Sequence, residues 1–216
     1  APQVLDALRT AAAAASWPEL EKSLLWQACQ IGQHAGLDGK ILDRCVSRVL
    51  AIDPSFRPAL DLADALYTQS GRHQDLVEVL EQMLRTGLTP DERGGLLRRL
   101  AKLHEERRNP AKAATAIEEA AALAPDDPDL LRELGALRKE AGDFAGLAVV
   151  LGRLADLSED AEERRALLLE AANLYETNLE DLGAARAILE RLRVDDPEDG
   201  AVLVRLERIY EGTGDY

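Results

Sequence analysis

Apolar residues recur along the chain at intervals of three and four positions, the spacing that gives a helix one buried face. Within residues 89–157 this pattern is written twice, and each member of the first set is followed 34 positions later by an apolar or small residue. The first set is Leu97, Leu100, Ala101, Ala113, Ile117 and Ala120, and the second is Leu131, Leu134, Gly135, Leu147, Leu151 and Leu154. A repeat of this length predicts a stack of helix pairs in which each pair packs on its neighbours.

Helix-starting and helix-ending residues divide the chain into units of one helix pair each. We expect helices to start at capping boxes that begin at Ser16, Thr89 and Asp160, and to end at turn glycines such as Gly71. The expected units are approximately 18–54, 55–89, 90–125, 127–158 and 160–196, with a half unit at 197–216. Together with a short helix before them, these units predict an all-α protein of about twelve helices, arranged as a right-handed α-solenoid of antiparallel pairs.

Gly94 and Gly95 follow the strong helix start at Thr89, although glycine inside a helix costs about 1 kcal/mol relative to alanine. One interpretation is close packing against the preceding helix, at a place where a side chain does not fit. The other interpretation is a hinge between the two halves of the array. The sequence favours packing and leaves the hinge open.

The order of large and small residues in these units resembles the tetratricopeptide repeat family, whose 34-residue unit is a helix-turn-helix. The unit that agrees best contains Leu97, Leu100, Ala101, His104, Ala113, Ile117, Ala120 and Pro125. Two residues depart from the pattern: Asp64 occupies a place for a small residue, and Arg138 a place where an aromatic residue is usual. Because some units are longer than 34 residues, a HEAT or armadillo type of solenoid is the second interpretation.

The composition argues against several classes of partner. Lys and Arg number 26 against 40 Asp and Glu, which gives a net charge of −14. Such a charge repels a phosphate backbone, so we expect no nucleic acid as a partner. No apolar run approaches the ~20 residues that span a bilayer, so no membrane insertion is expected. The chain starts without Met and without a signal peptide, which indicates a fragment of a longer, cytoplasmic chain and leaves a removed export signal open.

Motifs for catalysis or metal binding are not found in the sequence. It contains no P-loop, dinucleotide fingerprint, nucleophile elbow or HExxH, so we expect no catalytic residues, no cofactor and no enzyme activity. Three histidines lack the spacing of metal ligands, so no metal site is expected. Cys29 and Cys45 are interpreted as reduced core residues, and a disulfide between adjacent helices is the alternative.

The resemblance implies that side chains of the first helix in each pair line a concave groove that binds a protein segment. Among the inward places, four in adjacent units carry positive charge: Arg98, Lys102, Arg132 and Lys139. Other candidate binding residues are Asn173, Arg208 and, as an aromatic anchor, Trp26. Cations in a groove would bind acidic side chains or a terminal carboxylate. The alternative, which the sequence favours, is that solvated ion pairs balance these cations, with Glu105, Glu106, Asp129 and Glu140 as partners.

These observations predict a non-catalytic scaffold that binds a peptide or protein segment, with acidic residues, in its groove. The alternative is a structural or regulatory arm of a larger multidomain enzyme, or a scaffold that self-associates through the ends of the stack.

Overall fold

The computed structural model describes residues 2–36 and 39–213, and these residues form twelve helices and no strand. The helices are α1 (Pro2–Ala13), α2 (Pro18–His34), α3 (Gly39–Ile52), α4 (Arg57–Ser70), α5 (His73–Met83), α6 (Pro90–Glu106), α7 (Pro110–Leu123), α8 (Pro128–Ala141), α9 (Phe144–Leu157), α10 (Ala161–Thr177), α11 (Leu182–Asp195) and α12 (Gly200–Thr213). The predicted all-α fold is confirmed. The chain divides into two compact units, Ala1–Leu96 (unit 1) and Leu97–Tyr216 (unit 2).

Unit 1 contains α1 to α5 and the first turns of α6, and each helix from α1 to α5 packs on the next. Its core includes the fully buried side chains of Leu60 and Leu80. Cys29 and Cys45 are free thiols in this core, in agreement with their interpretation as reduced core residues. A hydrogen bond between the thiols, together with burial, raises the pKa of Cys29 above its ordinary value.

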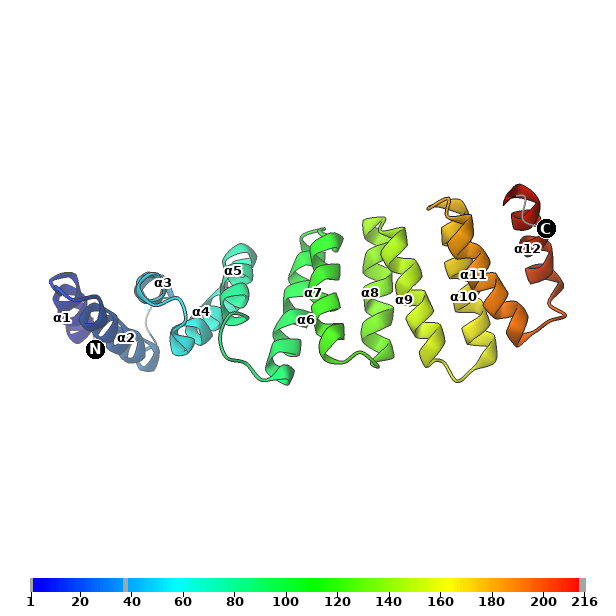
Figure 1. Ribbon diagram of the computed structural model, residues 1–216. Helices are drawn as coiled ribbons and strands as arrows, with labels where there is room; N and C mark the ends of the chain where they lie inside the picture. Colours follow the sequence, from blue (N-terminus) through cyan, green and yellow to red (C-terminus); the bar gives the residue numbers. More distant parts are fainter. Residues whose placement is uncertain (1, 37–38, 214–216) are drawn as a thin grey trace. The chain divides into compact units, whose positions relative to one another are not determined.

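Unit 2 continues the same construction, since each helix from α7 to α12 packs on the next and neighbouring helices run in opposite directions (Figure 1). One core cluster joins α10, α11 and α12 through Leu168, Leu189 and Leu206. Small residues permit close approach between helices. A Cβ atom added at Gly135 of α8 would lie 3.5 Å from Val150 of α9, in van der Waals contact.

Several helix ends form where the sequence predicts them. Thr89 and Glu92 make a complete capping box at the start of α6: the Thr89 backbone N–H donates to Glu92 Oε2 at 2.9 Å, and the Glu92 N–H donates to Thr89 Oγ1 at 3.3 Å. Gly71 and Gly142 have left-handed φ values of 65° and 73° and end α4 and α8. The part of the last half unit at 214–216 lies outside the described residues.

Two predicted capping boxes are corrected. Ser16 does not cap α2, because Pro18 occupies the first turn and makes Trp17 the N-cap residue, which forms no side-chain cap. Asp160 does cap α10, accepting the Glu162 N–H at 2.9 Å, but Glu163 accepts a hydrogen bond from the Ser158 hydroxyl at 2.7 Å. In both helices the N-cap is the residue directly before the first helical residue, and its side chain determines whether a capping hydrogen bond forms.

The packing interpretation of Gly94 and Gly95 is wrong. A Cβ atom added at either residue would meet no atom within 4 Å, so space does not require glycine there. The boundary between the compact units falls one residue after Gly95, between Leu96 and Leu97. The hinge interpretation stays a prediction.

Arg138, which replaces the usual aromatic residue, lies partly buried between α8 and α9. Its side chain is 15% exposed and forms ion pairs with Glu118 at 2.6 Å and with Asp143 at 3.2 Å. The guanidinium group occupies the space beside Gly146, where a Cβ atom would overlap it. Its buried Nε has no hydrogen-bond partner among the described residues. Glycine at residue 146 and arginine at residue 138 are therefore matched to each other.

Candidate functional site

The four predicted basic residues, Arg98, Lys102, Arg132 and Lys139 (the basic set), all lie exposed on first helices of unit 2. Arg98 and Lys102 are one turn apart on α6, and Arg132 and Lys139 are two turns apart on α8, so each pair occupies one helix face. The exposed fractions of the Arg98, Arg132 and Lys139 side chains are 56%, 53% and 68%. A partner can therefore reach these cations from solvent.

Three members of the basic set are paired with carboxylates. Arg98 lies 3.5 Å from Asp127, and Lys139 lies 3.6 Å from Glu170. Arg132 pairs with Asp129 at 3.0 Å and with Glu163 at 3.4 Å. Asp129 is a partner expected from the sequence, whereas Asp127, Glu163 and Glu170 belong to the following first helix or its cap and were not predicted. Lys102 takes no part in these pairs.

Negative charge is present on the same face. Glu133 of α8 has a pKa raised above its ordinary value, because the site is partly desolvated and because Glu105 of α6 adds like charge, while Arg98 opposes the shift. The surface formed by α6 and α8 thus carries both cations and carboxylates.

The remaining predicted binding residues do not join the basic set into one pocket. Asn173 lies exposed on α10 and Arg208 lies exposed on α12. Trp26 is half-buried on α2 in unit 1, and its ring meets that of Phe56 edge to face with centroids 5.3 Å apart. This contact uses Trp26 for packing within unit 1. Exposed apolar surface appears instead at Val204 of α12, which is 65% exposed and lies four residues before Arg208.

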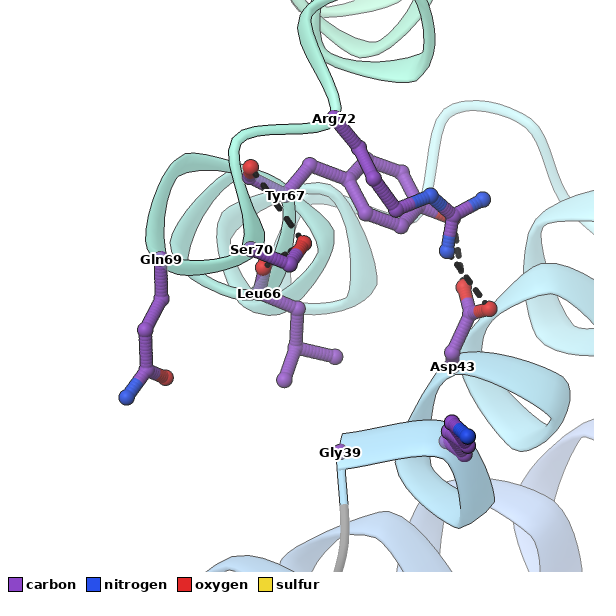
Figure 2. A pocket seen from close by; sticks show the side chains of 8 residues that line it. Gly39, Asp43, Leu66, Tyr67, Gln69, Ser70 and Arg72 are labelled. Carbon is purple, nitrogen blue, oxygen red and sulfur yellow. Dashed lines mark hydrogen bonds and ion pairs between the residues drawn. The ribbon is translucent and has the colours of Figure 1, made fainter.

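A pocket of about 700 Å³ in unit 1 was missed by sequence reasoning. It lies where the start of α3 meets the end of α4, and Figure 2 shows Arg72 beside the Tyr67 ring and facing Asp43. The Arg72 guanidinium carbon lies 4.4 Å from the ring centroid, and its Nη1 is 2.7 Å from Asp43 Oδ2. The Tyr67 hydroxyl donates to Asp43 at 2.9 Å, and burial raises the pKa of Tyr67 above its ordinary value.

The charged groups of this pocket already have partners within the protein, because Arg72 pairs with Asp75 at 2.8 Å as well as with Asp43. Leu66 and Gln69 border the more open part (Figure 2). The signal in the sequence is faint: Asp43 and Arg72 are 29 positions apart, and only the turn at Gly71 indicates that Arg72 returns toward the preceding helices. The pocket is a weaker candidate than the basic set, since its cation is already held at short distances.

Other kinds of site find no support in the described part of the chain. Among residues 2–36 and 39–213, no three His, Cys, Asp or Glu side chains are grouped as a metal ion would require. None of the helices in these ranges is both long and apolar enough to cross a bilayer.

The sequence of α6 to α8 decides the family. The family model described as "Tetratricopeptide repeat" matches residues 94–137, which contain most of α6, all of α7 and most of α8. These residues belong to the tetratricopeptide repeat family. For this segment the match sets aside the HEAT or armadillo interpretation. A comparison with curated protein sequences finds no significant match.

Solved structures agree with this fold. The structure of Naa15/Naa10 bound to HypK-THB is similar with a TM-score of 0.51 and 17% identity, and the match covers 90% of this repeat protein and 29% of that chain. The TPR protein YrrB matches with a TM-score of 0.42 and 15% identity, over 83% of this chain and 89% of the other. PilF of Pseudomonas aeruginosa matches with a TM-score of 0.38 and 16% identity, over 98% of both chains. Only the first of these similarities is close enough to support the fold.

Proposed function

We propose that this repeat protein is a non-catalytic scaffold that binds an acidic segment of a partner protein on the first-helix face of unit 2. The observation that carries the proposal is the exposure of the four basic residues on consecutive first helices, α6 and α8. Spaced cations on a rigid helical face suit carboxylates presented along an extended or helical segment. A structure with this fold, that of Naa15/Naa10, is bound to HypK-THB.

The same face offers apolar contacts beyond the basic set. Leu169 of α10 is half-buried, and Val204 of α12 is 65% exposed. They occupy the same place in successive units as Arg98 and Arg132, so at this one place the residue changes from cationic at α6 and α8 to apolar at α10 and α12. The partner segment that fits this order carries carboxylates at one end and apolar side chains at the other.

The test measures fluorescence anisotropy of a labelled peptide that carries four Glu residues followed by Leu residues, at about 100 mM salt, where the Debye length is ~10 Å. Reversing the charge of the basic set should abolish binding. The variant is Arg98→Glu, Lys102→Glu, Arg132→Glu and Lys139→Glu.

A matched control reverses four exposed cations of second helices and turns, which changes the net charge by the same amount. The control should bind the peptide more weakly than the unmodified protein only to the extent that the added negative charge repels the peptide. The control variant is Arg107→Glu, Lys112→Glu, Arg191→Glu and Arg193→Glu. Equal loss in both variants would show that net charge, and not this face, governs binding. Absence of binding to the unmodified protein would refute the proposal.

A further inference from the structure

Successive first helices are joined by at least one ion pair at every junction that the described residues contain. In each pair a cation on one first helix meets a carboxylate at or near the start of the next first helix. The pairs are Lys22 with Asp53 (3.0 Å), Arg57 with Glu92 (3.7 Å), Arg98 with Asp127 (3.5 Å), Arg132 with Glu163 (3.4 Å) and Arg165 with Asp199 (2.6 Å). The first two pairs lie in unit 1 and the other three lie in unit 2.

We call the five ion pairs between successive first helices the ladder. In unit 2 the ladder uses cations of the basic set. Arg98 and Arg132 are both ladder residues and candidate binding residues. Lys139 behaves in the same way, because its partner Glu170 also lies on the next first helix. In the unbound protein, three of the four groups proposed to bind a partner are thus already paired with carboxylates of the protein itself.

The geometry of these pairs permits exchange. Their distances of 3.4 to 3.6 Å exceed the 2.7–2.9 Å of strong charge-assisted hydrogen bonds, and the carboxylates of Glu163 and Glu170 are 45% and 47% exposed. At the α10–α12 junction, by contrast, Asp199 is 9% exposed and lies 2.6 Å from Arg165. Asp199 also accepts the backbone N–H of Ala201 at 3.0 Å, so this pair has a structural role at the start of α12.

We infer that Asp127, Glu163 and Glu170 act as internal competitors for an acidic partner, so that they determine specificity on the proposed binding face. This inference rests on the proposed function. A single partner carboxylate that displaces one of them exchanges one exposed ion pair for another and gains little. A segment whose carboxylates reach several cations at once gains from linkage, because each contact after the first forms at high effective concentration. The competitors therefore select partners with spaced carboxylates and reject isolated ones.

The test neutralises two competitors and leaves Asp127 intact, since Asp127 also caps α8 by accepting the Asp129 N–H at 3.0 Å. Glu163→Gln retains an amide oxygen for the Ser158 hydroxyl, and Glu170→Gln is a conservative change on an exposed side chain. The charge-matched control is Glu159→Gln with Glu198→Gln, two exposed turn residues outside the ladder.

The probe is the labelled four-Glu peptide described above, and a peptide with a single Glu is measured beside it. The double variant should bind the four-Glu peptide about threefold to tenfold more tightly than the unmodified protein, whereas the control should change its affinity by about twofold or less. The single-Glu peptide should gain less, because it contacts only one of the two freed cations, whereas the four-Glu peptide contacts both.

Equal affinity of the unmodified protein, the double variant and the control for the four-Glu peptide would overturn the inference and leave the proposed function standing. Failure of all three proteins to bind would refute the proposed function, and the inference with it. Circular dichroism of each variant checks that the helices are retained.

Discussion

Replacing Gly146 by alanine tests the contact that Arg138 makes between α8 and α9. A Cβ atom at residue 146 would overlap the Arg138 guanidinium and the Asp143 carboxylate. The Arg138 side chain, which is only 15% exposed, must then move away from ion pairs at 2.6 Å with Glu118 and 3.2 Å with Asp143. The atoms that the new Cβ would meet belong to charged side chains. Relieving the overlap therefore disturbs the ion pairs that these side chains form.

The size of the effect follows from two opposing contributions. Hydrogen bonds to charged groups contribute about 1.5–3 kcal/mol, which sets the loss when the guanidinium is displaced. Alanine in place of a helical glycine returns about 1 kcal/mol. Gly146→Ala should therefore lower the free energy of unfolding by about 0.5–2 kcal/mol. When Arg138 is already alanine, most of the overlap is gone, and the same substitution should raise the free energy of unfolding by up to about 1 kcal/mol.

Urea unfolding of the unmodified protein, both single variants and the double variant gives the coupling between the two positions. We expect a coupling energy of about 1.5–3 kcal/mol, with unchanged dependence on urea concentration. If Gly146→Ala has the same effect with and without Arg138, the matching of these two residues is wrong.

The other predictions concern α6. Replacing Gly94 and Gly95 by alanine should raise the free energy of unfolding by about 1 kcal/mol per residue, because a Cβ atom at either position meets open space; a loss of stability in thermal or urea unfolding would show that the backbone there needs glycine. If these glycines are also a hinge, the double variant should narrow the distribution of distances between spin labels placed in units 1 and 2, while an unchanged distribution would exclude a hinge. Thr89→Ala should destabilise the protein by about 0.5–2 kcal/mol, measured in the same way, and an unaltered midpoint would contradict the capping role. The backbone and hydroxyl of Thr89 hold the pKa of Glu92 below its ordinary value. The stabilisation by ionised Glu92 is therefore complete above the unfolded-state pKa of about 4.3 and is lost as the pH falls through the lower pKa of the folded state. Glu92→Gln should remove this part of the acid sensitivity, and an identical pH profile would refute the assignment.

The fold was predictable because local and long-range signals agree. The 34-residue recurrence from Leu97 to Leu131 marks the same buried position, and both side chains are fully buried. Helix starts were predictable where the capping residue directly precedes proline, as at Thr89-Pro90. The prediction failed at Ser16, because one extra residue, Trp17, separates it from Pro18 and takes the N-cap position. The failure at Gly94 has a different cause, since open space around a glycine leaves no mark on the sequence.

The candidate site was predictable only in part. The resemblance to the tetratricopeptide repeat placed Arg98 and Arg132 on exposed first-helix faces, and that placement depends on their own helices alone. Their partners Asp127 and Glu163 lie 29 and 31 positions further along, and the pairing depends on how one unit packs on the next. A search for a cation followed by a carboxylate at about the repeat length would have found these pairs. The pocket at Tyr67 has no comparable period, because its lining comes from the ends of two helices and a turn.

Charge acts on the proposed binding face at two distances. The net charge of −14 repels an acidic segment once the segment comes within about one Debye length of the protein surface, ~10 Å at 0.1 M salt, because salt screens the charges at longer range. On contact, Arg98, Arg132 and Lys139 attract the segment, but carboxylates of the protein already pair with all three. A partner overcomes both effects only when several of its carboxylates reach several of these cations together, since each single exchange replaces one exposed ion pair by another. An acidic protein whose binding face carries four cations, three of them already paired, can in this way select spaced carboxylates without a deep pocket.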